Sequence, residues 1–244
     1  MTVLVTRAAQ DSEKTIARLA EHGINAIAAP AVEIRPCGEP DLPATCRALI
    51  VTSTNAIRTI AGRAELSSLL GIPLYAVGDR TADAARQAGF TQVRSASGTV
   101  GDLAGLVRSE IAPREGVLVH VRGREVAGEL GGELASAGYT VERRIVYESV
   151  CADRLPEAAV AAMETRAVDA VLLYSPKSAD YFGRLTAKAG LSGRLADLTA
   201  VVMSLNVADR ARAAGFGHTI VANRPDESAL IESLERFLKG RLKD

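Results

Sequence analysis

The sequence contains no tryptophan, and its cysteines are too few and too scattered to form a recognisable site. Cys37, Cys46 and Cys151 show neither C-x-x-C spacing nor a nearby set of histidines, which argues against a metal centre or a disulfide framework. Neither a G-x-G-x-x-G nor a Walker A loop is present, so no nucleotide fingerprint exists. We therefore expect no metal site and no nucleotide cofactor held by such a loop.

The chain also lacks net charge and long apolar runs. Its 29 basic residues balance its 29 acidic residues, so composition gives no support for general binding to nucleic acid or to a membrane surface. No stretch approaches the length of a membrane span, and a strand-like run begins at Val3 without a basic leader segment. We expect a protein of the reducing cytoplasm, with neither a nucleic-acid nor a membrane partner.

What the chain does contain is a repeat. The segment from Arg47 to Phe90 has a second copy that begins at Asp169, so that Ser53 corresponds to Ser175 and Gly89 to Gly215 at nearly the same offset. The opening segment 3–23 recurs in the same way at 117–138. Matched segments at a common offset indicate duplication of a whole supersecondary block.

Each repeated unit reads as a buried strand followed by a helix, which predicts parallel sheets covered by helices on both faces. In the first unit, Asp11 or Ser12 is the expected helix cap and Gly23 the expected stop. Segments 29–37 and 141–151 lie outside the repeat, and their alternating apolar residues predict extended connectors. Two arrangements stay open: the middle block and the two ends of the chain form separate domains, or the chain divides into a first and a second half.

Small polar residues follow the predicted strands. A hydroxyl or amide at such a junction caps the next helix, and the free backbone N–H groups there can bind an anion. Capping alone is the commoner role for any one of them, but several at the carboxyl ends of the strands favour a bound polyanion. The polar candidates are Thr52, Ser53, Asn55, Thr81, Ser175, Ser178, Ser204 and Asn206. Gly78 is added because a glycine allows a ligand to approach the backbone closely.

Charged and aromatic candidates are fewer. Cations on the same loops could pair with substrate carboxylates, although a solvated charge is the commoner state of each; they are Arg7, Arg80, Arg122, Arg124 and Lys177. His120 follows valines in a strand-like run, which indicates a partly buried histidine. Tyr147 lies on the second connector, where its ring has apolar neighbours and its phenol can face a binding site.

Six short motifs, taken together in order and spacing, resemble the uroporphyrinogen-III synthase family over nearly the whole chain. They are V-L-V-T-R at 3–7, T-S-x-N-A at 52–56, A-V-G-x-x-T-A at 76–82, V-Y at 146–147, S-P-x-S at 175–178 and A-x-R-P-D-E-S-A-L at 222–230. The resemblance implies two similar flavodoxin-like parallel-sheet α/β domains joined by a two-stranded β-ladder. It places 1–30 plus 152–244 in domain 1, 31–44 and 140–151 in the ladder, and 45–139 in domain 2.

The resemblance also implies a reaction without a cofactor: linear hydroxymethylbilane loses water and closes to uroporphyrinogen III with ring D inverted. Tyr147 matches the family's ladder tyrosine and is the candidate to assist departure of the hydroxyl. By the same matching, Thr52, Ser53, Thr81 and Ser175 are expected to line the substrate site. The full set of expected substrate contacts adds the strand-end candidates Arg7, Asn55, Gly78, Arg122, Gly123, Lys177, Ser178, Ser204 and Asn206. Val207 departs from the pattern, because a threonine often stands there; Ser204 or Asn206 could replace its hydroxyl.

The partners implied are the bilane itself and, transiently, hydroxymethylbilane synthase, and we expect a monomer. One alternative stays open, a non-catalytic ligand-binding or regulatory protein on the same scaffold.

Overall fold

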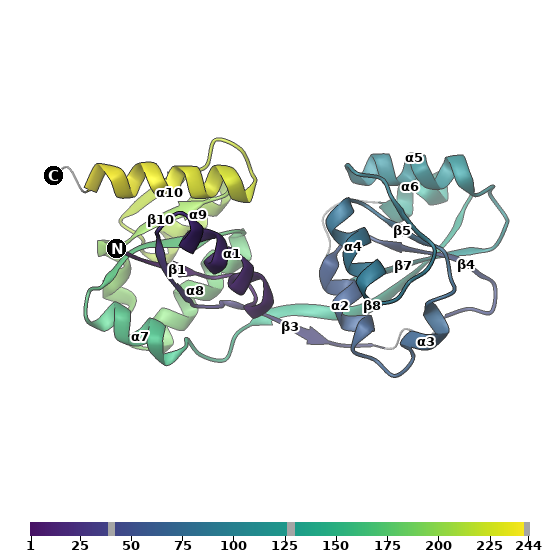
Figure 1. Ribbon diagram of the computed structural model, residues 1–244. Coiled ribbons are helices and arrows are strands. Elements are labelled where there is room, and N and C mark those ends of the chain that lie inside the picture. The colour runs from purple at the N-terminus through teal and green to yellow at the C-terminus, as the bar shows by residue number, and fades with distance from the viewer. Residues whose placement is uncertain (39–41, 126–129, 242–244) are drawn as a thin grey trace. The chain divides into compact units, whose positions relative to one another are not determined.

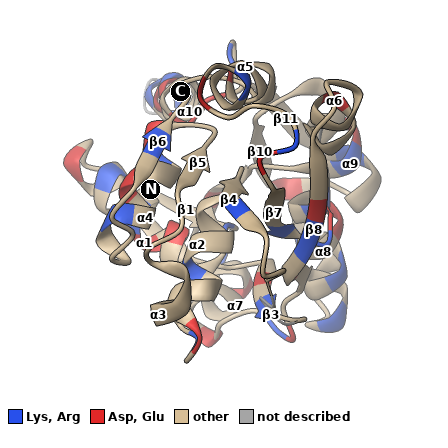
Figure 2. Cartoon of the chain, turned by 90° about the vertical axis from the view of Figure 1, so that its right-hand side faces the viewer, with Lys and Arg blue, Asp and Glu red and all other residues tan. Residues whose placement is uncertain are grey.

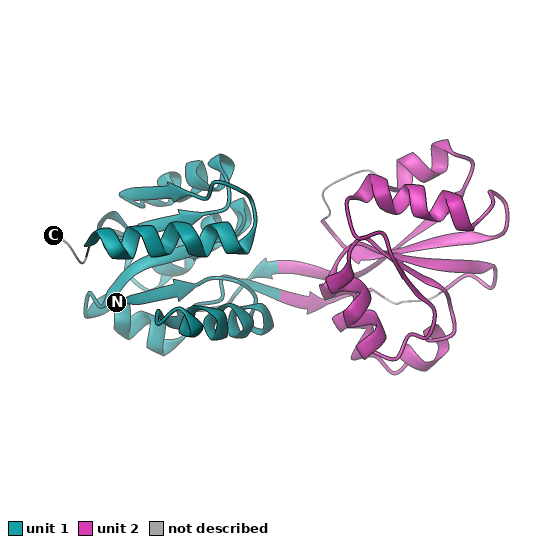
Figure 3. Ribbon diagram, turned by 45° about the horizontal axis from the view of Figure 1, so that its top comes forward, with its two compact units in different colours: residues 1–33, 150–244 teal, residues 34–149 magenta. Residues whose placement is uncertain are grey.

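The computed structural model describes residues 1–38, 42–125 and 130–241, and it divides into two compact units (Figure 1). Unit 1 comprises Met1–Glu33 and Val150–Asp244, and unit 2 comprises Ile34–Ser149 (Figure 3). The middle block of the chain is thus one unit, and the two ends together form the other.

Unit 1 is built on a five-stranded parallel sheet. Its order is β11 (His218–Val221), β10 (Thr199–Val202), β9 (Val168–Leu173), β1 (Thr2–Val5) and β2 (Asn25–Ala28). Val3 and Val5 pack with α1 (Ala9–Glu21) and α10 (Glu227–Arg241). Leu4 faces the opposite core, with α7 (Glu157–Glu164), α8 (Pro176–Lys188) and α9 (Leu205–Ala214). Burial on both faces explains why these strands read as continuous apolar runs.

Unit 2 has a six-stranded sheet. Its order is β3 (Val32–Pro36), β8 (Thr140–Cys151), β7 (Val117–Gly123), β4 (Cys46–Val51), β5 (Leu74–Ala76) and β6 (Val93–Ser95). One core lies against α2 (Thr54–Ala61), α3 (Leu66–Leu69) and α4 (Asp79–Gln87). The other lies against α5 (Val100–Glu110) and α6 (Leu130–Ser136). Every strand pair from β8 to β6 is parallel.

The two units share one strand order. The series β8-β7-β4-β5-β6 of unit 2 matches β2-β1-β9-β10-β11 of unit 1 position by position. Numbered along the chain, unit 1 has the flavodoxin-like order 2-1-3-4-5, whereas in unit 2 the two strands that correspond to β1 and β2 come last, as β7 and β8. Each repeated unit of the sequence therefore occupies the same place in its own sheet. The predicted α/β fold with parallel sheets is confirmed.

Strands β3 and β8 form the ladder through which the chain passes between the units (Figure 3). Cys37 N donates to Val146 O at 2.9 Å and Ala152 N donates to Ala31 O at 3.0 Å, so the two strands run antiparallel. The first ladder strand is shorter than the expected 31–44, because β3 ends at Pro36 and Gly38 turns away with φ +59°. Residues 39–41 of that expectation lie outside the described residues.

The expected cap of the first helix is wrong. Helix α1 begins at Ala9 with Ala8 at the cap position and no side-chain cap, so Asp11 and Ser12 lie inside its first turn. Ser12 is fully buried, and its hydroxyl donates to Arg7 O at 2.9 Å instead of capping. Sequence reasoning also missed the short strands β2, β6 and β11. The expected stop at Gly23 is present, with φ +69°.

No helix within residues 1–38, 42–125 and 130–241 is long and apolar enough to cross a membrane. Basic and acidic residues are interspersed along the elements in the view of Figure 2, as the balanced composition leads one to expect.

Close packing of α8 on α9 gives a stability prediction. A Cβ added at Gly183 would lie 2.8 Å from the Cβ of Ala214, so we expect Gly183→Ala to lower the free energy of unfolding by about 1–3 kcal/mol through overpacking. The matched control is Gly240→Ala in α10, where a Cβ would meet nothing within 4 Å. Chemical denaturation of both variants tests this, and equal stability of the two would contradict it.

Candidate active site

The candidate residues of unit 2 gather at one edge of its sheet. Thr52 and Ser53 follow β4, Gly78 follows β5, and Arg122 and Gly123 end β7. Because β5, β4 and β7 are parallel neighbours, their carboxyl ends meet at the same edge. This edge is where a doubly wound α/β unit presents its ligand-binding loops.

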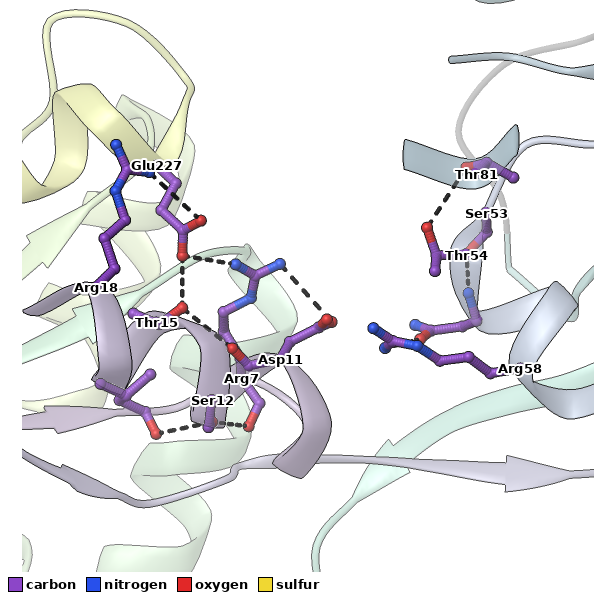
Figure 4. A network of polar contacts seen from close by, with 12 residues as sticks. Arg7, Asp11, Ser12, Thr15, Arg18, Ser53, Thr54, Arg58, Thr81 and Glu227 are labelled. Carbon is purple, nitrogen blue, oxygen red and sulfur yellow. Dashed lines mark hydrogen bonds and ion pairs between the residues drawn. The ribbon is translucent and has the colours of Figure 1, made fainter. Parts of the chain in front are cut away.

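Tyr147 reaches this edge from β8. Its side chain is buried, with 7% of its surface exposed, and its Oη donates a hydrogen bond to Ser53 Oγ at 3.1 Å. Ser53 is the N-cap of α2, and its Oγ also accepts a bond from Asn55 N at 3.2 Å (Figure 4). The phenol and the capping hydroxyl therefore form one hydrogen-bonded pair.

Gly123 makes room for that phenol. It is the register partner of Tyr147, directly after an irregularity between Arg122 and Gly123. A Cβ at Gly123 would lie 2.6 Å from Tyr147 Cζ and 3.0 Å from its Oη. We predicted Gly123 as a substrate contact, but in this structure the tyrosine ring covers it.

His120 was predicted only to be partly buried, but the structure also brings it next to a candidate site residue. It is only 3% exposed on β7, and its Nε2 lies 3.4 Å from Thr52 Oγ1. Its Nδ1 is buried and has no hydrogen-bond partner among the described residues. Burial first, and then the charges of Arg122 and Arg143, lower its pKa to about 4. The imidazole is therefore neutral near pH 7 and can hold the Thr52 hydroxyl.

The backbone at the start of α4 is not capped by a side chain. Gly78 occupies the N-cap position with no side-chain cap, and a Cβ there would meet nothing within 4 Å. Thr81, one turn into the helix, is only 6% exposed, and its hydroxyl lies 3.5 Å from that of Thr54 (Figure 4). There is thus open space beside Gly78, whereas the Thr81 hydroxyl faces that of Thr54.

Arg122 has no acidic partner among the described residues. Its Nε donates to Gly123 O at 3.1 Å and its Nη2 to Arg124 O at 3.4 Å, and it forms no ion pair with any described residue. Arg124, by contrast, pairs with Glu148 at 3.0 Å. Of these two arginines, Arg122 is the better placed to accept a substrate carboxylate.

Arg7 of unit 1 is engaged within its own unit. Its guanidinium lies 2.9 Å from Glu227 Oε1 and 3.7 Å from Asp11, and it stacks 4.7 Å above the ring of Tyr174 (Figure 4). Thr15 also donates to Glu227. The sequence predicted Arg7 as a substrate contact; in the structure it ties the start of α10 to the loop after β1.

The serines that follow β9 form a capping box at the start of α8. Ser175 Oγ accepts from Ser178 N at 3.1 Å, while Ser178 Oγ accepts from Ser175 N at 3.0 Å. Ser178 is only 2% exposed and donates to Ser175 O, so its hydroxyl serves the cap. Lys177 projects beside it, with Nζ 5.6 Å from the ring of Tyr181.

The loop after β10 differs from its counterpart in unit 2. Ser204 holds the N-cap position of α9 without a side-chain cap, and Asn206 is exposed. Val207 is 1% exposed and packs in the core, and Thr81 in unit 2 is buried as well. The departure at Val207 therefore alters a buried position, and Asn206, in the first turn of α9, is an exposed polar group.

No group of three or more histidine, cysteine or acidic side chains that could hold a metal lies within the described part of the chain.

Comparison with known proteins identifies the family. The family model described as uroporphyrinogen-III synthase HemD matches residues 13–232, which is most of the chain. The chain belongs to the uroporphyrinogen-III synthase family. It is accordingly a cyclising lyase of porphyrin and haem biosynthesis, as the motifs predicted. No curated protein sequence matches it.

Two solved uroporphyrinogen-III synthases share the fold. The enzyme from Helicobacter pylori 26695 is 18% identical with a TM-score of 0.64, covering 97% of this chain and 99% of the other. A mutant enzyme from the extremely thermophilic bacterium Thermus thermophilus is 17% identical with a TM-score of 0.51, and the match covers 100% of both chains. At these identities the likeness concerns the fold alone.

Burial of His120 predicts a pH dependence of stability in this synthase. Its pKa is about 4 in the folded chain against roughly 6.5 when unfolded, so the unfolded state binds the proton first as pH falls. This contribution to stability is complete above pH 6.5 and declines by roughly 3 kcal/mol between pH 6.5 and 4. His120→Gln should flatten that part of the curve.

Urea denaturation at a series of pH values measures the effect. The control is His218→Gln, which alters an exposed histidine and should leave the wild-type curve unchanged. Parallel curves for wild type and His120→Gln would contradict the assignment.

Proposed function

We propose that the synthase closes hydroxymethylbilane to uroporphyrinogen III using the cluster at the carboxyl edge of the unit 2 sheet. The observation that carries this proposal is the bond from the Tyr147 phenol to the Ser53 hydroxyl at 3.1 Å. It supplies a proton-donating pair at the edge where the parallel strands of unit 2 end. A phenol is a weak acid, so its expected contribution is modest, about tenfold to a thousandfold.

The substrate is a flexible chain that carries many carboxylates, and the protein's main task is to hold it in a ring-closing geometry. Thr52 and the N-termini of α2 and α4 are proposed to bind carboxylates, with open space at Gly78 for close approach. Arg122 adds one cation. In unit 1, the proposed contacts are Ser175, Lys177, Ser204 and Asn206.

Three further properties belong to the same proposal: a cytoplasmic location, a monomeric state and transient contact with hydroxymethylbilane synthase. The support for the contact is chemical. The bilane closes spontaneously to the type I isomer, so a short transfer between the two enzymes limits that loss.

Product analysis tests the reaction directly. Freshly generated hydroxymethylbilane is supplied to the full chain, the products are oxidised, and the type I and type III uroporphyrins are separated. We expect type III to predominate in proportion to enzyme concentration. Type I alone, from protein shown to be folded by circular dichroism, would refute the enzyme and leave a binding or regulatory protein on this scaffold.

Arg122 and Arg124 form a matched pair for the binding step. Arg122→Gln removes an uncompensated cation and should raise KM about tenfold with little change in kcat, as expected for a lost charge-assisted hydrogen bond. Arg124→Gln removes an arginine already paired with Glu148 and should change KM little. Equal effects of the two substitutions on KM would show that Arg122 has no special contact with substrate.

A further inference from the structure

The hydrogen bond between Tyr147 and Ser53 has a direction that matters for proton transfer. Tyr147 is buried and its hydroxyl hydrogen is donated to Ser53, whereas Ser53 is partly exposed. Ser53 Oγ accepts two hydrogen bonds, from Tyr147 Oη and from Asn55 N. No described residue accepts the hydrogen of Ser53 itself. That hydrogen is therefore free to be donated to a ligand.

We propose that Ser53 hands the proton to the departing hydroxyl of the substrate and that Tyr147 replaces it. This inference rests on the proposed function and assigns the group that touches the leaving oxygen. Ser53 becomes a catalytic residue, and Tyr147 becomes the acid behind it.

The carbon–oxygen bond of the hydroxymethyl group breaks with its electron pair on oxygen, which takes the Ser53 hydroxyl proton and leaves as water. Ser53 Oγ takes the Tyr147 proton, leaving a phenolate, while the pyrrole nitrogen stabilises the cationic carbon that remains. When the ring later closes, the carbon that was attacked loses a proton, which returns through Ser53 to the phenolate. The net change is the loss of one water molecule.

Neither hydroxyl suffices alone. An aliphatic hydroxyl is a much weaker acid than a phenol, so Ser53 needs a donor behind it. The Tyr147 phenol is buried against Gly123, and its hydrogen already points at Ser53. Gly123 is a positioning residue here, because any side chain at that position would push the ring from its place. The two hydroxyls act as one unit.

Four variants test the relay: Ser53→Ala, Ser53→Asn, Tyr147→Phe and the double variant Ser53→Ala with Tyr147→Phe. Residues that act as a unit show non-additive losses. We expect each single variant to lower kcat for type III formation by a similar factor, about tenfold to a thousandfold, and the double variant to be no slower. Asparagine can accept from Asn55 N and from the phenol but cannot pass a proton, so Ser53→Asn separates relay from capping.

Ser53→Thr keeps a hydroxyl and should retain most of the wild-type kcat. Thr165→Ala removes a hydroxyl that donates to Ala161 O at the end of α7 in unit 1 and should leave kcat unchanged. We expect a solvent deuterium isotope effect on the kcat of the wild type. This isotope effect should be smaller in the slow variants if their reaction no longer passes a proton through both hydroxyls.

Two results would overturn the relay. The first is a wild-type kcat in Ser53→Asn while Tyr147→Phe is slow, since the phenol would then act directly. The second is additive losses in the double variant, since the hydroxyls would then have separate roles. Failure of the proposed function would give a different result from failure of the relay, because the wild-type chain would then produce only the type I isomer.

Discussion

The parallel pairing of β8 with β7 is the interaction on which the arrangement of the site depends. Strand β8 leaves the ladder and continues into the unit 2 sheet, and this pairing sets Tyr147 beside Gly123. Because β7 in turn pairs with β4, the phenol reaches the end of β4 and its capping serine. An irregularity between Arg122 and Gly123 re-aims the last residues of β7. A shift of register by one residue would turn the phenol to the other face of the sheet.

The two units share a duplicated fold, but the polar side chains at their strand ends make different contacts. At the end of β7, Arg122 bonds only to backbone carbonyls among the described residues and keeps its charge. At the end of β1, the corresponding strand, Arg7 is neutralised by Glu227 and Asp11. Capping serines stand at the same place in both units, yet only Ser53 receives a phenol. The chemistry we propose therefore lies with unit 2.

The sequence predicted the larger features because they rest on local patterns. Repeated strand–helix units predicted two parallel sheets, and motif order predicted the family, both of which are confirmed. Sequence patterns did not predict the features that depend on contacts between strands far apart in the chain. Nothing in the local sequence shows that Gly123 lies under a tyrosine, or that His120 is held neutral below Thr52. Strands of three or four residues such as β6 carry too short a pattern to detect, and Ser12 resembles a cap until its burial is known.

The cluster consists of groups that suit a polyanionic substrate. A carboxylic acid with an ordinary pKa would already be ionised near pH 7, before the substrate arrives, and would repel the carboxylates that the proposed site must bind. The hydroxyls of Tyr147, Ser53 and Thr52 can donate hydrogen bonds to an arriving carboxylate without placing a negative charge beside it, and burial keeps His120 uncharged near pH 7. Because the substrate's own nitrogen drives departure of the hydroxyl, weak donors suffice. In the proposed mechanism, proton donation and carboxylate binding thus take place at one edge of one sheet.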